Sequence, residues 1–167
     1  MSLLRLCEWL ASTPGSIALH ESRYMFLLVL TVHVLTLALF AGTVLMIDLR
    51  ILGVTMRRVP ASEVVRRLLP WSAAGLLLMV VSGALLFYSA PLVRYHNVFF
   101  RFKLAVLVFA VLNSWIFHVT VFRRVAEWDL DPVPPRTARL ASGLSLLSWA
   151  AIITAGRMMA YQEYWFD

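Results

Sequence analysis

A histidine stands inside an otherwise apolar run of the sequence, TVHVLTLALFAG, which covers residues 31–42. Ionisable side chains are costly among apolar helices in lipid, so they usually face the bundle interior or water. Imidazole is the usual ligand for haem iron and a common ligand for copper or zinc. His33 and His118, which lies in a second apolar run, are therefore the first candidates for metal ligands.

The two histidines are not expected to bind the same iron within one chain. Along a helix, His33 lies ~4–5 Å from the centre of its apolar run, near Thr36. His118 lies ~10 Å from the centre of its run, near Val111, in the opposite direction. The resulting gap of roughly 15 Å is too large for two axial ligands of one haem, so His118 would ligate a second centre only across a subunit interface.

Basic side chains are predicted beyond His33, towards the same membrane surface. Lys103 and Arg157 lie ~10–12 Å from the centres of their own apolar runs, and Arg101 lies slightly further out. A haem with its iron at His33 and its propionates among these cations would satisfy both kinds of group. A quinone head group or an anionic lipid could use the same basic ring. The candidates for a sixth iron ligand are Met79 and Met158.

Each of these residues also has a purely structural explanation. His33 can donate a hydrogen bond to a serine or threonine of a neighbouring helix. His118, one turn after Ser114, fits a structural polar clamp. Lys103 can extend its ammonium group to the lipid head groups, and the methionines can fill the core. His20 is expected at the membrane interface, before the first spanning helix.

The composition indicates the helices that must position these side chains. Of the 167 residues, 61% are hydrophobic and only 14% are charged, and the mean hydropathy is +0.80. A spanning helix needs about 20 mainly apolar residues. Four stretches qualify: Tyr24–Ile47, Pro70–Ala90, Phe99–Phe122 and Leu140–Tyr161. The single cysteine, Cys7, excludes an internal disulfide and a Cys-ligated iron–sulfur cluster.

The short connections predict an all-α fold, an integral membrane four-helix bundle with up-down-up-down topology. Residues 1–22 form an interfacial segment in which a short helix over Leu3–Leu10 ends at Thr13-Pro14-Gly15, and residues 23–167 form the transmembrane domain. Pro70 is expected in the first turn of the second span. Small residues should face the neighbouring helices: Ser72, Gly75, Ser82 and Gly83 in the second span, and Ser142, Ser145, Ser148 and Gly156 in the fourth.

The basic residues predict the orientation and exclude one class of partner. The two loops after the first and third spans carry nine of the fifteen arginines and lysines, and the other side carries six. The positive-inside rule then places both termini in the periplasm of a bacterial inner (cytoplasmic) membrane. The formal charge of +6 is explained by these flanks and by lipid head groups, so nucleic acid is not expected as a partner.

Three segments together resemble an uncharacterised family of small four-helix bacterial membrane proteins. They are HVLTLALFAGTVLMIDLRILG, FRFKLAVLVFAVLNSWIFH and AGRMMAY. That family is distantly similar to copper-resistance D proteins and to small membrane b-type cytochromes. The resemblance implies that the family pattern includes His33, Asp48-Leu49-Arg50, Arg101, Lys103, Asn113, His118, Gly156 and Arg157, and it makes haem or copper more plausible.

The sequence therefore predicts a membrane b-type cytochrome-like electron-transfer subunit with haem b at His33. A copper-handling protein, with His33, Met79 and Met158 as ligands, is the first alternative. A non-catalytic accessory or assembly subunit, which binds lipids and partner membrane subunits or forms a homo-oligomer, is the second. No acid–base pair, nucleophile or phosphate loop suggests a stand-alone enzyme.

Overall fold

The computed structural model describes residues 3–166, and within this range all regular structure is helical. Four long helices contain most of the chain, and shorter helices lie between and beside them. The bounds are α1 Leu3–Ala11, α2 Pro14–Glu21, α3 Arg23–Ile51, α4 Ala61–Ser89, α5 Pro91–His96, α6 Val98–Ile116, η1 Phe117–Val121, η2 Phe122–Glu127, α7 Arg136–Met158, η3 Met159–Tyr161 and α8 Glu163–Phe166. The segment η1 has π-helical hydrogen bonding and η2 is a 3₁₀ helix.

Four helical stretches are long and apolar enough to cross a membrane: Arg23–Ile51, Ala61–Ser89, Val98–Glu127 and Arg136–Tyr161. They coincide with the four spans predicted from the sequence, and each begins before its predicted span. Most of their large apolar side chains point outward. This arrangement suggests a multi-pass membrane protein, because in lipid the outer surface of a bundle need not be polar.

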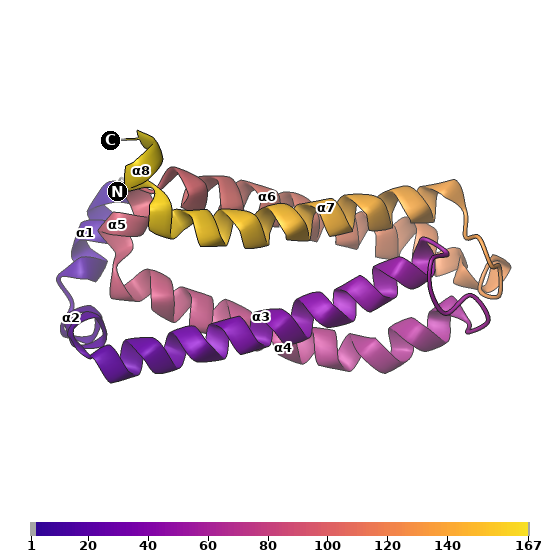
Figure 1. Cartoon of the computed structure of the whole chain (residues 1–167), viewed down its shortest axis with the longest axis horizontal. Helices are drawn as coiled ribbons and strands as arrows, with labels where there is room; N and C mark the ends of the chain where they lie inside the picture. Colours follow the sequence, from indigo (N-terminus) through magenta and orange to yellow (C-terminus); the bar gives the residue numbers. More distant parts are fainter. Residues whose placement is uncertain (1–2, 167) are drawn as a thin grey trace.

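The four long helices lie side by side in an elongated body (Figure 1). We call the end that carries both chain termini, α1, α2, α5 and α8 the terminal end. The opposite end carries the loops 52–60 and 128–135, and we call it the loop end (Figure 1). The most extensive helix contact is that between α3 and α4. The contact between α6 and α7 comes next, followed by that between α3 and α7.

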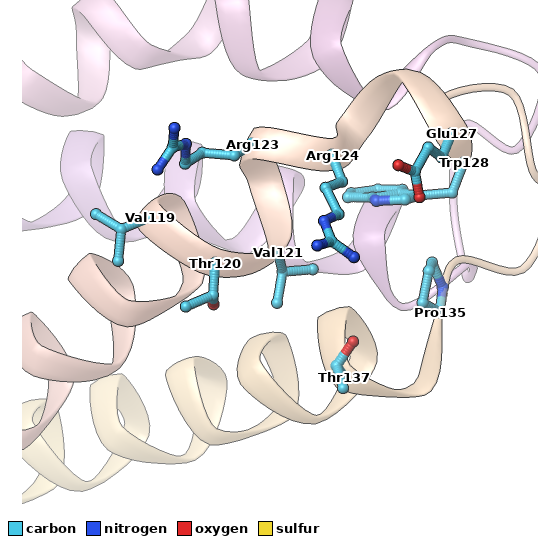
Figure 2. A pocket seen from close by; sticks show the side chains of 9 residues that line it. All are labelled: Val119, Thr120, Val121, Arg123, Arg124, Glu127, Trp128, Pro135 and Thr137. Carbon is cyan, nitrogen blue, oxygen red and sulfur yellow. The ribbon is translucent and has the colours of Figure 1, made fainter.

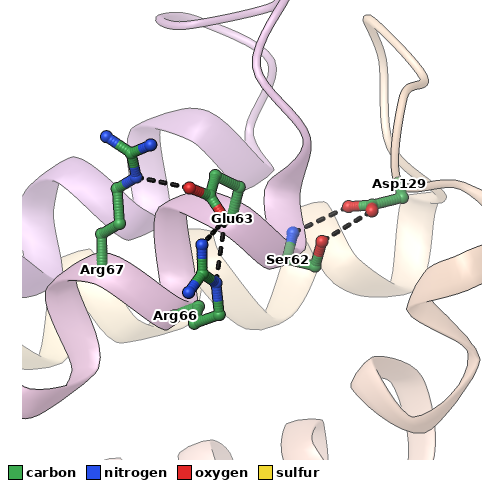
Figure 3. A network of polar contacts seen from close by, with 5 residues as sticks. All are labelled: Ser62, Glu63, Arg66, Arg67 and Asp129. Carbon is green, nitrogen blue, oxygen red and sulfur yellow. Dashed lines mark hydrogen bonds and ion pairs between the residues drawn. The ribbon is translucent and has the colours of Figure 1, made fainter.

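Helix α4 begins nine residues earlier than predicted, so Pro70 lies inside it rather than in its first turn. The cause is a cap from a distant part of the sequence. The carbonyl of Asp129 accepts a hydrogen bond from the backbone nitrogen of Ala61 at 3.0 Å. Its carboxylate accepts two more from Ser62, from the backbone nitrogen at 2.7 Å and the hydroxyl at 2.6 Å, as Figure 3 shows. These bonds satisfy backbone donors that a helix start leaves free.

The same end of α4 carries an exposed ion-pair group on its other side. Glu63 accepts hydrogen bonds from Arg66, one turn later, at 2.5 and 2.9 Å (Figure 3). Arg67 binds the second carboxylate oxygen at 2.5 Å. Such exposed pairs contribute little stability, so the Asp129 cap is the contact that fixes where α4 begins.

The N-terminal segment forms two short helices where one was predicted. Helix α1 ends near the predicted Thr13-Pro14-Gly15 stop, but Pro14 also begins α2, because proline fits the first turn of a helix. Two contacts attach this segment to the end of α4. The Thr13 hydroxyl lies 2.6 Å from the Tyr88 hydroxyl, and the Ser16 hydroxyl donates to the Tyr88 carbonyl at 2.7 Å.

Small residues allow α3 and α4 to approach closely, as predicted. A Cβ atom on Gly75 would lie 3.2 Å from both the nitrogen and the Cβ of Phe40. One turn away, the buried Ser72 hydroxyl donates to the Thr43 hydroxyl at 2.7 Å. The Phe40 ring meets the Trp149 ring edge-on, with 4.6 Å between the ring centres, which joins this helix pair to α7. Phe40 therefore packs against both α4 and α7, and polar groups gather on either side of it along α3.

Candidate functional site

His33 points into the bundle and contacts the neighbouring helix α4. Its Nδ1 atom lies 2.9 Å from the Ser82 hydroxyl, and the backbone of Met79 lies beside the same ring. A Cβ atom on Gly83 would lie 3.2 Å from the ring, so glycine leaves the space that the imidazole occupies. A hydrogen bond between His33 and a serine of a neighbouring helix is thus present, as one expectation required.

Lys103 reaches the same region from α6. It is half-buried, and it is close enough to His33 for the two side chains to interact electrostatically. A Cβ atom on Gly156 of α7 would lie 3.6 Å from its Nζ atom. All four long helices therefore contribute to one cluster, which we call the His33 centre: His33, Ser82, Gly83, Lys103 and Gly156. Within residues 3–166 no carboxylate pairs with Lys103.

The other basic residues of the predicted ring lie at the surface. Arg157 is exposed, donates a hydrogen bond to the Tyr161 hydroxyl at 3.2 Å, and places its guanidinium 5.5 Å from the centre of that ring. Arg101 is exposed as well. Arg94, in the short helix α5 and outside the predicted ring, is half-buried; it donates to the Ala90 carbonyl at 3.2 Å, and burial lowers the pKa of its guanidinium. Of the predicted cations, only Lys103 is brought to His33.

The two candidate methionines differ in burial. Met79 is buried in α4, one turn before Ser82, whereas Met158 is half-buried at the end of α7. Within the described residues, no group of three or more His, Cys, Asp or Glu side chains could hold a metal ion. A metal at His33 would therefore need methionine sulfur, a non-protein ligand, or a ligand from a second chain.

His118 lies outside the His33 centre. It is exposed in the π-helical segment η1, and its Nδ1 atom lies 3.0 Å from the Ser114 carbonyl of the preceding turn. This contact holds the ring against its own helix. His118 is thus close to Ser114, as expected, but this hydrogen bond is made to the preceding turn and does not connect two helices.

A buried carboxyl group, which the sequence analysis did not select as a site residue, lies in the half of the bundle nearest the loop end. Asp48 on α3 is 6% exposed. Ser142 and Ser145 of α7 lie beside its carboxyl group. Its Oδ2 atom is buried and has no hydrogen-bond partner within residues 3–166. The sequence pointed only weakly to Asp48 as a site residue, because a carboxylate near the end of a membrane span is usually interpreted as a residue at the span boundary.

Asp48 lines a cavity of about 450 Å³ between the helices, which we call the Asp48 cavity. The walls are mainly apolar and include the aromatic side chains of Phe40, Trp115, Phe117 and Trp149. Leu69 and Ala73 of α4 and Val111 of α6 are lining residues that are also exposed on the outer surface of the bundle. The cavity therefore opens sideways between α4 and α6.

Arg50, two residues after Asp48, has a different role. It is fully buried, and its guanidinium donates to backbone carbonyls of both loops at the loop end. The Nε atom binds the Val59 carbonyl at 2.7 Å, and the terminal nitrogens bind those of Asp129 and Asp131 at 3.1–3.5 Å. Arg50 thus joins the loops and does not form an ion pair with Asp48.

A second, larger hollow of about 900 Å³ lies at the loop end beside η1 and η2. Figure 2 shows Arg124 extending along it towards Val121, next to the Trp128 ring, with Arg123 on the other side of the ribbon. Within the described residues neither arginine forms an ion pair. With Glu127 as the third charged lining residue, the hollow carries a net positive charge at one end of the bundle.

Comparison with known proteins adds one finding. The model of a family of unknown function (DUF6644) matches residues 15–162, which cover all four long helices. The chain belongs to this family. No curated protein and no solved structure matches it. The expected membership of an uncharacterised family is consistent with this match, whereas no match links the chain to copper-resistance D proteins or cytochromes.

Proposed function

We propose that this chain is an electron-transfer subunit of the bacterial inner membrane that binds haem b through the Nε2 atom of His33. The supporting observation is the contact between Nδ1 of His33 and the Ser82 hydroxyl at 2.9 Å. Metal-binding histidines are usually oriented by such a hydrogen bond at the other ring nitrogen. Because Ser82 occupies Nδ1, Nε2 is the nitrogen left to coordinate iron.

Lys103 supports the same proposal. Its ammonium group lies beside Gly156 and within electrostatic range of His33, and no carboxylate of the described residues neutralises it. A haem propionate is an anion of the kind that would do so. Met79 of α4 or Met158 of α7 would supply the sixth ligand, and Arg101 and Arg157 would interact with lipid head groups at the surface.

A copper-handling function is the second candidate. It is favoured by the burial of Met79 in α4, because the backbone of this residue lies beside the ring of His33. Thioether sulfur and imidazole are suitable ligands for Cu(I). If neither haem nor copper is bound, the remaining alternative is an accessory subunit that acts through lipids and partner helices.

In the proposed arrangement the helices form an up-down-up-down bundle with the loop end in the cytoplasm and both termini in the periplasm. The unpaired Arg123 and Arg124 at the loop end then face the anionic head groups of the inner leaflet. Partner membrane subunits or a second copy of the chain would complete an electron-transfer route.

The test is an absorption spectrum of the full chain, expressed with a supply of haem and purified in detergent. We expect a Soret band and an α band that sharpens on reduction. His33→Ala should abolish both bands, whereas His20→Ala, which removes an exposed imidazole of α2, should leave them unchanged.

Ser82→Ala tests the role of the hydrogen bond at Nδ1 of His33 without removing the imidazole. Loss of a partner that orients a ligating histidine typically lowers metal affinity by about 10–100-fold. Ser148→Ala is the matched control, because within residues 3–166 this buried serine donates to the Leu144 carbonyl of its own helix and to no other helix. A colourless protein that contains copper by elemental analysis would replace the haem proposal with the copper one.

A further inference from the structure

We propose that the Asp48 cavity binds an apolar molecule that carries a protonated amine, with the ammonium group at the carboxylate of Asp48. This site is separate from the His33 centre, because fifteen residues of one helix separate His33 from Asp48, or ~22 Å at 1.5 Å per residue. The inference does not depend on haem binding.

The first support is the unsatisfied oxygen. Asp48 is 6% exposed, and Ser142 and Ser145 face its carboxyl group, yet Oδ2 has no hydrogen-bond partner within residues 3–166. A buried polar atom without a partner costs free energy, so such atoms in folded proteins call for an explanation. Because Asp48 lines the cavity, rotation of its carboxylate would bring this oxygen to a donor on a bound molecule.

The second support is the absence of a protein cation for this carboxylate. No salt bridge within residues 3–166 includes Asp48. The nearby Arg50 directs its guanidinium to carbonyls of the two loops instead. His118 lines the same cavity, but its Nδ1 atom contacts the Ser114 carbonyl. A bound ammonium group would both neutralise the carboxylate and donate a hydrogen bond to it, whereas a neutral alcohol would only donate.

The third support is the chemistry and the opening of the cavity. Its aromatic walls include Phe40 and Trp149, and aromatic faces attract organic cations. The remaining lining is mainly aliphatic and suits an apolar body. Since Ala73 of α4 and Val111 of α6 line the cavity and are exposed on the bundle surface, an apolar molecule can enter between these helices.

The experiment compares two probes with the same skeleton, 4-phenylbutylamine and 4-phenylbutanol. Binding to the purified full chain in lipid nanodiscs is measured by calorimetry at neutral pH, where the amine is protonated, and binding to empty nanodiscs is subtracted. We expect the amine to bind at least about tenfold more tightly than the alcohol, since hydrogen bonds to charged groups are the stronger ones.

Asp48→Asn keeps the shape of the side chain and removes its charge. We expect the affinity of this variant for the amine to fall to that for the alcohol. Glu21→Gln is the matched control, because it removes an exposed carboxylate at the other end of the molecule. Ala73→Phe narrows the opening and should weaken both probes. Size-exclusion profiles and thermal unfolding show that each variant remains folded.

Three outcomes overturn the proposal. In the first, the wild-type chain binds neither probe. In the second, it binds both equally and Asp48→Asn changes nothing, which would indicate a cavity for neutral lipid chains. In the third, the alcohol binds as tightly as the amine and loses affinity in Asp48→Asn, which would assign the site to a neutral hydroxyl donor such as a hydroquinone.

Discussion

Replacing Gly75 by alanine should loosen the contact between α3 and α4. The new Cβ atom would lie 3.2–3.3 Å from the nitrogen, Cα and Cβ of Phe40. These atoms belong to the backbone of α3 or are attached directly to it, so no flexible side chain can move aside. Phe40 is also held by the Trp149 ring. Relief requires a shift of one helix against the other, and overpacking of this kind typically costs about 1–3 kcal/mol.

The control isolates this steric cost. Gly42 also lies inside a long helix, but a Cβ atom there would meet nothing within 4 Å. Glycine to alanine in a helix interior gains up to about 1 kcal/mol from helix propensity, and this gain applies to both positions. The difference between the free energies of unfolding of Gly75→Ala and Gly42→Ala is therefore the steric term alone, about 1–3 kcal/mol.

The assay is reversible unfolding of the purified chain in mixed micelles, with rising mole fractions of a denaturing detergent, followed by circular dichroism. Gly75→Ala should unfold at a lower mole fraction than the wild-type chain, and Gly42→Ala at the same or a higher one. Equal midpoints for the two variants would refute close packing of α4 on Phe40.

Two further predictions concern the loop end. Arg50→Met should lower the free energy of unfolding by at least about 3 kcal/mol in the same assay, because it leaves buried carbonyls of both loops without their charged donor. The control, Arg66→Met, removes an exposed partner of Glu63 and should change the free energy of unfolding little. A cysteine at the exposed Val54, placed in a Cys7→Ser background, should react with an impermeant thiol reagent only after the membrane of intact spheroplasts is permeabilised. Labelling of intact spheroplasts would mean that the loop end faces the periplasm.

The sequence was sufficient to predict features that depend on composition and periodicity. Four apolar stretches predicted the four long helices, and small residues such as Gly75 and Ser82 indicated the faces that pack. The start of α4 could not be predicted, because its cap, Asp129, is 67 residues away in the sequence from Ser62.

The candidate site could be predicted only in part, because it too depends on contacts between residues that are distant in the sequence. A histidine inside an apolar run can be recognised locally, and a hydrogen bond from His33 to a serine was one expectation. That Lys103 turns towards His33 while Arg157 turns towards Tyr161 depends on helix rotation, which the spacing of cations does not determine. The burial of Oδ2 of Asp48 without a partner, in a residue that lines a cavity, depends on the packing of four helices at once.

The cap on α4 has a consequence for the order of assembly in the membrane. The hairpin of α3 and α4 is synthesised first, yet the acceptors for the free donors of Ala61 and Ser62 come from Asp129, in the loop of the second hairpin. Arg50 likewise obtains only the Val59 carbonyl from its own hairpin. Until the second hairpin inserts, we expect α4 to fray back towards Pro70, the boundary that the sequence alone predicts. A chain truncated before α6 should therefore insert its first two spans but leave residues 61–69, the first turns of α4, open to protease, whereas in the full chain the capped helix protects them.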